Sequence, residues 1–207
     1  MRLKQIKPQK GITKEKARLL ARLKADGSVF KSNTDYVVSY DSSNLQEIQR
    51  TSSDISKVYG LRVKILRHRS GKNPQKLLYK MFVRSKLMYE DLLLYGKYRS
   101  ENWEVPTEIL NAIIDIKREF LRTFFEDEGT VLKNEIRLYS INKIGLTKIQ
   151  ELLREFEIES VIRGGFGLKR NVHAISIGKK QERAKFSSLI GFLSEEKNRK
   201  LSNFLSG

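Results

Sequence analysis

The feature that most constrains the fold of this chain is an internal repeat. The segments LLARLKADG (19–27) and LRTFFEDEG (121–129) both carry the apolar spacing of a helix, and both end in an acidic residue followed by glycine. The two glycines, and the two acids before them, lie 102 positions apart. After each segment the pattern predicts the same succession of strand, strand, helix, strand, strand and helix. We therefore expect two similar halves related by a pseudo-two-fold axis.

Glycine, proline and a helix-capping asparagine mark where the expected helices begin and end. Gly27 and Gly129 are expected to end the two repeated helices, Gly27 in the left-handed conformation that glycine adopts easily. Asn44 is expected to cap a helix that ends at Gly60. Polar residues around Pro106 indicate a linker. The chain then divides into a basic arm (1–12), a first subdomain (13–96), the linker (97–108) and a second subdomain (109–207). We expect helices over 13–26, 44–59, 86–96, 108–128 and 145–156, and helical segments after residue 178. Strands are expected near 28–33, 35–41, 61–66 and 76–83, as a pair within 130–141, and near 159–166 and 171–178.

The charge balance indicates a polyanionic partner. Lys and Arg number 41 against 24 Asp and Glu, which gives a formal net charge of +17. Such a surplus repels itself unless it faces a polyanion, so nucleic acid is the first candidate and a membrane surface the second. At 39% hydrophobic residues, the chain has enough apolar side chains to build a core.

Residue types that are scarce or absent exclude several classes of protein. Cysteine is absent, which rules out disulfide frameworks, zinc fingers and thiol nucleophiles. Only two histidines occur, His68 and His173, which argues against a Ser-His-Asp triad. No apolar run reaches the roughly 18–20 residues of a membrane span, and the basic N-terminus lacks the apolar core of a signal peptide. We therefore expect an intracellular, cytoplasmic protein.

The acids that end the repeated helices are the candidate metal-binding residues. Two such helices packed side by side would bring Asp26 and Glu128 together, and paired carboxylates need a cation between them or raised pKa values. Carbonyl oxygens at the helix ends, such as that of Ala25, complete an all-oxygen set that suits Mg²⁺ or Mn²⁺. A single acid at such a place is usually a solvated helix end. The repeat and the basic strands favour a metal site that hydrolyses phosphodiesters.

The paired segments resemble the signature motif of the LAGLIDADG homing endonucleases, in the intron-encoded, archaeal-type form with two motifs in one chain. The resemblance implies an α+β fold of two pseudo-symmetric αββαββα subdomains, with saddle-shaped antiparallel sheets and paired central helices. It also implies that Asp26 and Glu128 bind the catalytic metal. Asp127 stands where the motif usually has alanine or glycine, which makes it an alternative ligand.

The resemblance further implies a lysine or glutamine at the end of the second strand of each half, near the hydrolytic water. Aligning YVVSYDS with RLYSINK places Asp41 and Ser42 opposite Asn142 and Lys143. The second half then has a lysine, Lys143, at this place, whereas the first half has none. We expect the first active-site arm to be weaker, or to take a lysine from elsewhere in the chain.

The resemblance also places both sheets in the major groove of DNA, and strand alternation selects the side chains that face it. Arginine and lysine read guanine edges, and both residue types recur along the predicted strands and their turns. The predicted DNA-binding residues are Lys31, Asn33, Arg62, Lys64, Arg67, Arg69, Lys76, Lys80, Arg84, Lys133, Arg137, Tyr139, Arg163, Lys169 and Arg170.

The function that the resemblance implies is site-specific cleavage of double-stranded DNA. One phosphodiester in each strand of a long pseudo-palindromic target would be hydrolysed by a monomer with Mg²⁺ or Mn²⁺, leaving 3′ overhangs. No small-molecule substrate and no membrane partner are expected. The alternative is an RNA maturase that assists intron splicing on the same fold, with intron RNA as its partner. A DNA-binding transcription regulator of the same fold is disfavoured, because such proteins usually lose the acids.

Overall fold

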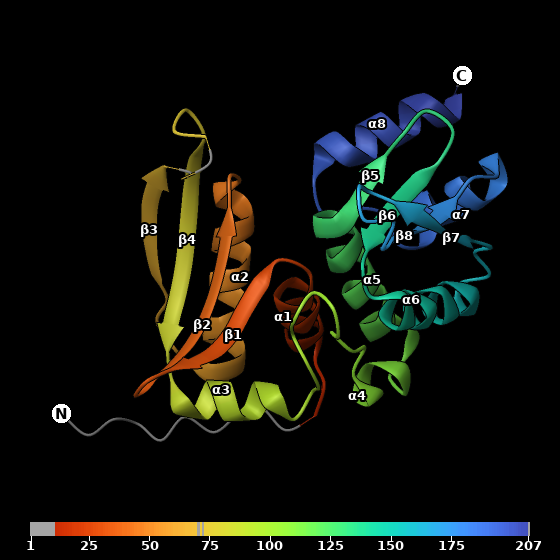
Figure 1. Cartoon of the computed structure of the whole chain (residues 1–207). Helices are drawn as coiled ribbons and strands as arrows, with labels where there is room; N and C mark the ends of the chain where they lie inside the picture. The colour runs from red at the N-terminus through yellow and green to blue at the C-terminus, as the bar shows by residue number, and fades with distance from the viewer. Residues whose placement is uncertain (1–10, 70, 72, 207) are drawn as a thin grey trace.

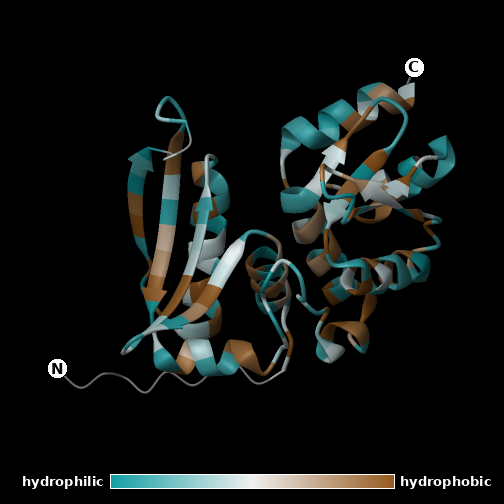
Figure 2. Ribbon diagram, in the orientation of Figure 1, coloured by the Kyte–Doolittle hydropathy of each residue, from teal (hydrophilic) through white to brown (hydrophobic). Residues whose placement is uncertain are grey.

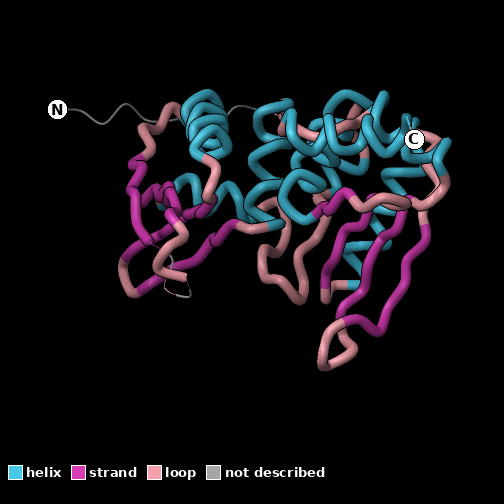
Figure 3. Tube along the Cα trace, turned by 90° about the horizontal axis from the view of Figure 1, so that it is seen from above, coloured by secondary structure: helices cyan, strands magenta, loops and turns pink. Residues whose placement is uncertain are grey.

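Each half of the molecule is a four-stranded antiparallel sheet with its helices on one side (Figure 1). The computed structural model describes residues 11–69, 71 and 73–206, so residues 1–10 of the predicted basic arm lie outside the described residues. Viewed from above, the helices of both halves form one layer and the strands of both sheets lie on the other side (Figure 3). The predicted α+β fold with two αββαββα units is confirmed.

The two halves repeat the same order of elements. The first half comprises α1 (Lys14–Ala25), β1 (Gly27–Ser32), β2 (Asp35–Ser42), α2 (Leu45–Tyr59), β3 (Lys64–Arg69), β4 (Leu77–Arg84) and α3 (Lys86–Leu93). The short α4 (Thr107–Leu110) precedes the second half. That half comprises α5 (Ile114–Glu128), β5 (Gly129–Val131), β6 (Ile136–Ser140), α6 (Lys143–Glu155), β7 (Val161–Phe166), β8 (Val172–Ile177), α7 (Lys180–Leu189) and α8 (Glu195–Ser206). The strand orders are β1-β2-β4-β3 (sheet A) and β5-β6-β8-β7 (sheet B).

The central helices α1 and α5 pack side by side and run parallel. Lys14 pairs with Asp115 at their N-terminal ends, Arg18 pairs with Glu119 in the middle, and Arg22 pairs with Asp127 near their C-terminal ends. Because three ion pairs follow one another in the same order along both helices, the two C-terminal ends must lie at the same end of the helix pair. This pairing is what brings the two repeated acid–glycine segments together.

The predicted helix over 108–128 is two helices, α4 and α5, separated at residues 111–113. Ile113 has an extended backbone (φ −66, ψ 157), and its side chain is 71% exposed. The apolar spacing of this segment carries no signal for a break. From the Lys14–Asp115 ion pair onward, α5 runs alongside α1.

The glycines after α1 and α5 have a different role from the one predicted. Neither has a positive φ; Gly129, for example, lies at −88. A Cβ at Gly27 would stand 2.6 Å from Leu23 Cα, and a Cβ at Gly129 would stand 2.3 Å from the Phe125 carbonyl oxygen. The chain passes directly from helix into strand, and only glycine allows that close approach. The predicted left-handed conformation at Gly27 was therefore wrong, whereas Gly60 ends α2 with φ 66.

The number of positions between equivalent residues of the two halves becomes smaller between the central helix and the second strand. Ser42 and Ser140 each accept a hydrogen bond from the backbone N–H two residues on, and those residues, Asn44 and Asn142, each cap the following helix. The hairpin of β1 and β2 is longer than that of β5 and β6, which shortens the spacing of the second half. The predicted alignment of Ser42 with Lys143 was therefore wrong, because Ser42 corresponds to Ser140.

One hydrophobic core joins the two halves. Leu20 and Ala21 of α1 and Phe120 and Phe124 of α5 are fully buried in a single cluster that continues under both sheets. Apolar residues concentrate where helices meet strands (Figure 2). Each buried aromatic ring of this kind contributes about 1.5–3 kcal/mol to the stability of the fold. Among the described residues, no helix has the length and apolarity that crossing a membrane requires.

Candidate metal centre and nucleic-acid interface

The parallel helix pair places the two predicted acids at a shared end. Asp26 follows α1 directly, and Glu128 is the last residue of α5. In the described part of the chain, neither carboxylate forms a side-chain hydrogen bond or an ion pair. Two carboxylates without ion-pair partners, one at the end of each of two neighbouring helices, are suited to holding a cation.

The pKa values of both acids are raised. Burial, and next the negative charge of Asp26, raise the pKa of Glu128 to about 7, against the positive charge of Lys197. Asp26 is exposed as a residue, yet partial desolvation of its carboxylate raises its pKa, against the positive charge of Arg22. The charge of Asp26 is thus near enough to raise the pKa of Glu128. Such a pair is stabilised in its ionised form by a bound cation.

Lys197 of α8 supplies a positive charge at this site, and sequence analysis did not identify it. Its ammonium group donates hydrogen bonds to the backbone carbonyls of Gly129, at 2.8 Å, and of Glu126. It also lowers the pKa values of Asp26 and Glu128. Because Lys197 lies 68 positions from Gly129 in the sequence, only the tertiary fold brings it there.

Asp127, the predicted alternative ligand, is not available to a metal. Its side chain is 2% exposed, forms an ion pair with Arg22 and accepts a hydrogen bond of 3.5 Å from the Tyr40 hydroxyl. Burial raises its pKa well above the usual range. The structure also explains why an acid occurs at a position where a small residue is usual, since Arg22 on the facing helix is its partner. Asp127 therefore joins the helices and does not belong to the candidate metal site.

Glu47, near the start of α2, is a third acid in the surroundings of the site. Its carboxylate accepts hydrogen bonds from the hydroxyls of Ser42, at 2.7 Å, and Tyr40, at 3.2 Å. The negative charge of Glu47 raises the pKa of Asp26. Among the described residues no group of three or more acidic or histidine side chains forms a closed metal cage. The candidate centre thus has two carboxylates and remains open to further oxygen ligands.

The predicted residues at the end of the second strands have other partners. Asn142 is buried as the N-cap of α6: its side chain accepts from Gly145 N–H at 3.0 Å and donates to the Trp103 carbonyl at 2.6 Å. Because these two hydrogen bonds occupy the Asn142 amide, the predicted catalytic role of Asn142 is not supported. Lys143 is the exposed first residue of α6. Asp41 pairs with His68 at 2.9 Å and Lys80 at 3.4 Å.

Each sheet has one face that points away from the helices, here called its open face. Strand register shows which basic residues lie on these open faces. On sheet A, the buried residues Val38, Met81 and Val83 mark the helix side. Three predicted residues of sheet A and three of sheet B lie on the open faces: Lys64, Lys80, Arg84, Arg137, Tyr139 and Arg163. Three others lie on the helix side of their strands: Lys31, Arg67 and Arg69. The rest lie in turns or before strands: Asn33, Arg62, Lys76, Lys133, Lys169 and Arg170.

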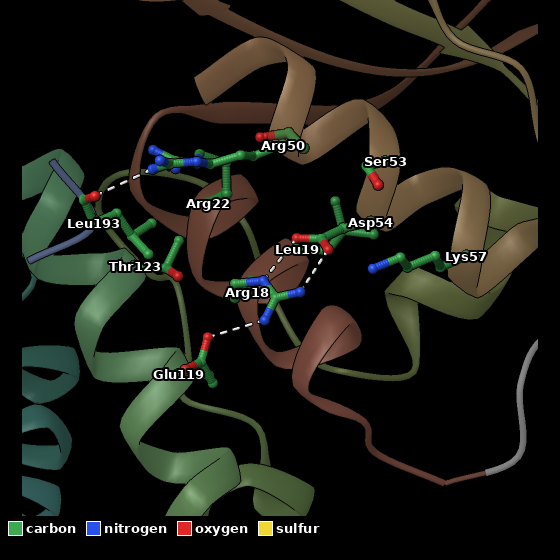
Figure 4. A pocket seen from close by; sticks show the side chains of 11 residues that line it. Arg18, Leu19, Arg22, Arg50, Ser53, Asp54, Lys57, Glu119, Thr123 and Leu193 are labelled. Atoms are coloured by element: carbon green, nitrogen blue, oxygen red, sulfur yellow. Dashed lines mark hydrogen bonds and ion pairs between the residues drawn. The ribbon is translucent and has the colours of Figure 1, made fainter. Parts of the chain in front are cut away.

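A cavity of about 260 Å³ lies between α1, α2 and α5, and neither Asp26 nor Glu128 lines it (Figure 4). Arg18 crosses it and donates to both Asp54 oxygens, at 2.7 and 2.9 Å, and to Glu119 at 2.9 Å. These two acids raise the pKa of Arg18, so its charge is permanent. The Arg18 guanidinium therefore connects three helices and supports the alignment of α1 with α5.

Two domain-family models match the two halves of the chain. The model of a LAGLIDADG-like domain matches residues 115–191, and the model of the WhiA N-terminal LAGLIDADG-like domain matches residues 13–95. The two matches fall on the two αββαββα units described above. No curated protein matches the sequence.

Solved structures share the fold over most of the chain. The homing endonuclease I-DmoI in complex with DNA and Mn is 17% identical, with 86% of this chain and 96% of that chain covered and a TM-score of 0.63. The homing endonuclease I-WcaI bound to its DNA recognition sequence is 14% identical over 93% and 88% of the chains, with a TM-score of 0.68. Full-length DUF199/WhiA from Thermatoga maritima is 14% identical over 94% and 61% of the chains, with a TM-score of 0.60. At these identities the likeness establishes the fold, and the activity has to be argued from the site.

Proposed function

The chain is built from two LAGLIDADG-like domains, and from that premise we propose that it is a divalent-metal-dependent endonuclease that cuts double-stranded DNA at specific sites. The observation that carries the proposal is the pair Asp26 and Glu128. Each half contributes one carboxylate to the same end of the helix pair, and each carboxylate lacks an ion-pair partner among the described residues. Two acids that repel each other at equivalent ends of paired helices destabilise the fold unless a cation binds between them.

The donor set fits a hard divalent cation. Asp26 and Glu128 would hold Mg²⁺ or Mn²⁺, and the Ala25 carbonyl at the end of α1 is a further oxygen donor. Such a cation supplies Lewis-acid stabilisation of a phosphodiester under attack. I-DmoI, which shares this fold, has been solved in complex with DNA and Mn, which supports the choice of metal.

The other residues of the site have separate tasks in this proposal. Lys197 offsets the repulsion between the two carboxylates and the phosphate backbone. Arg18 and Arg22 hold α1 against α5, so the acids from the two halves stay together. The basic residues of the open faces and turns bind the duplex, mostly through its phosphates. One monomer with two different halves suits a long pseudo-palindromic target, of the kind that intron homing requires.

Cleavage of a plasmid library with randomised sites tests the proposal. With Mg²⁺ we expect linear products that share a sequence at their ends, and with EDTA we expect none. The double variant Asp26→Asn/Glu128→Gln should bind DNA at least as tightly as the unmodified protein and should cut nothing. Glu101→Gln, which removes an exposed carboxylate of the linker, is the matched control and should cut normally. Cleavage by the double variant at the normal rate would contradict the proposal.

A second function is supported by the match of residues 13–95 to the WhiA N-terminal domain. In this alternative the protein binds DNA and does not cut it. The RNA maturase, with intron RNA as partner, is a further alternative without cleavage. Specific binding of DNA or intron RNA with no metal-dependent product in the library experiment would favour one of these two functions.

A further inference from the structure

The start of the last helix, α8, is bound to α5 by a carboxylate that the proposed function does not use. Glu126 of α5 is 5% exposed, and one of its oxygens accepts hydrogen bonds from the backbone N–H groups of Leu193, at 2.8 Å, and Ser194, at 3.0 Å. These two residues directly precede α8, which lies beside β5 (Figure 1). A buried side chain of the central helix therefore fixes the place where α8 begins.

Ser194 connects Glu126 to the first turn of α8. The Ser194 hydroxyl accepts a hydrogen bond from the backbone N–H of Lys197 at 3.3 Å, as the side chain of an N-cap does. The Ser194 carbonyl accepts from the backbone N–H of Asn198 at 3.3 Å. The Asn198 side chain in turn forms two hydrogen bonds of 2.9 Å with the backbone of Phe192. The first turn of α8 is thus rigidly joined to the residues that Glu126 binds.

The Lys197 side chain returns to the same end of α5. Its ammonium group donates to the carbonyls of Glu126 and Gly129, and it lies 4.0 Å from the other carboxylate oxygen of Glu126. Leu201 of α8 is buried in the core, but apolar contact is not directional. Hydrogen bonds are directional, so the bonds to Glu126 constrain where α8 presents Lys197.

The equivalent position of the first half carries the opposite charge. Lys24 lies 102 positions before Glu126 and is 1% exposed. Its ammonium group donates to the carbonyls of Tyr95, at 2.8 Å, and Lys97, at 3.0 Å, in the segment that follows α3. Both central helices therefore bind the segment that follows the last helix of their αββαββα unit. In the second half this segment leads into α8, which brings Lys197 to the acid pair.

We propose that Glu126 is a positioning residue, which holds Lys197 beside Asp26 and Glu128 by fixing the start of α8. Glu126 acts through Lys197 and needs no contact of its own with metal or DNA. The inference rests on the proposed function for the task of Lys197, which is to offset negative charge at the acid pair. The positioning depends on the acceptor oxygen of Glu126, because backbone N–H groups that lose their acceptor must move to find another.

Two variants separate the hydrogen bonds of Glu126 from its charge. Glu126→Gln removes the charge and keeps an oxygen that accepts from the two N–H groups, whereas Glu126→Ala removes both. Single-turnover cleavage of a site recovered from the plasmid library should be about tenfold or more slower with alanine than with glutamine, since a misplacement of about 1 Å can cost up to about 10²-fold. In the Lys197→Met background the alanine and glutamine variants should cut at equal rates.

Labelling of lysine amines with acetic anhydride, read by mass spectrometry, tests the position of Lys197 without metal or DNA. In EDTA, Lys197 should react about threefold faster or more in the alanine variant than in the glutamine variant, because its ammonium group is released from two carbonyls. Lys200, exposed on the same helix, is the internal reference and should react equally in both. If the alanine variant does not fold, Glu126→Asp, which draws the carboxylate back by one CH₂ group, replaces it in both measurements.

The two readouts distinguish positioning from a general contribution to stability. If alanine slows cleavage equally with and without Lys197, Glu126 supports only the fold, and the inference is overturned. Equal reactivity of Lys197 in the alanine and glutamine variants would overturn it as well. If the unmodified protein cuts no DNA with Mg²⁺, the proposed function fails, and the labelling of Lys197 still decides whether Glu126 positions it.

Discussion

Replacing Glu128 with glutamine should stabilise the metal-free protein at neutral and alkaline pH. Burial, with the added charge of Asp26, raises the pKa of Glu128 from its usual value of 4.5 to about 7 in the folded state. Between these two values the folded state binds more protons than the unfolded state, so stability falls as pH rises through this window. A pKa difference of this size corresponds to about 3 kcal/mol above pH 7 and to nothing below pH 4.5. Glutamine does not ionise, and the Glu128→Gln variant therefore avoids this loss.

Urea denaturation in EDTA at pH 4.5, 6, 7 and 8 measures the effect. The free energy of unfolding of the Glu128→Gln variant should equal that of the unmodified protein at pH 4.5 and exceed it by up to about 3 kcal/mol at pH 8. Glu101→Gln, at an exposed site, should show no such trend. A difference that stays constant with pH, or a variant that is less stable at pH 8, would refute the reasoning.

Three further predictions concern the surroundings of the acid pair and the charge of the whole protein. Lys197→Met should slow cleavage by roughly 10²–10³-fold because it removes a preorganised cation, yet it should tighten Mn²⁺ binding, since two carboxylates lose a competing positive charge. A defect of folding alone would weaken both, and parallel measurements of single-turnover cleavage and Mn²⁺ affinity distinguish the two. Arg22→Met should destabilise the fold by about 3–5 kcal/mol, because Asp127 is left buried without its partner, and Arg22→Met/Asp127→Leu should recover most of the loss in urea denaturation. Duplex binding should weaken steeply with salt, with a slope of log K against log salt near −7 if about 8 phosphates are neutralised. A slope shallower than about −2 in a fluorescence titration would contradict a DNA-facing basic surface.

The repeat predicted two similar halves and two acids at one end of a helix pair, whereas the α+β fold followed from the resemblance of the repeated segments to a known motif. Helical spacing, the acid–glycine ends and the repeat interval together require two helices that end alike, and two such helices pack most simply about a two-fold axis. The role of Gly27 was missed, since a steric approach to Leu23 leaves no mark in a single sequence. The alignment at Ser42 was wrong because the first hairpin of each half differs in length. This difference moves the equivalent positions along the sequence while the order of strands and helices stays the same.

The parts of the site that depend on tertiary packing could not be predicted. Lys197 lies in the last helix and reaches the end of α5 only in the folded chain. The Arg22–Asp127 pair joins two helices that are far apart in sequence, so Asp127 looked like a ligand when its partner was unknown. Asn142 is adjacent to a plausible catalytic lysine in sequence, yet its side chain caps a helix and contacts the Trp103 carbonyl.

The central claim is that Asp26 and Glu128, one from each half, form a single divalent-metal site. Electron paramagnetic resonance of Mn²⁺ titrated with the protein at pH 8 tests this claim without a known DNA target, because bound Mn²⁺ loses the signal of the free ion. The account predicts that Asp26→Asn and Glu128→Gln each weaken Mn²⁺ binding at least tenfold, and that the double variant is no worse than the weaker single variant by more than a few-fold. Glu101→Gln should bind as the unmodified protein does. Mn²⁺ affinity that stays unchanged in both single variants would contradict the account.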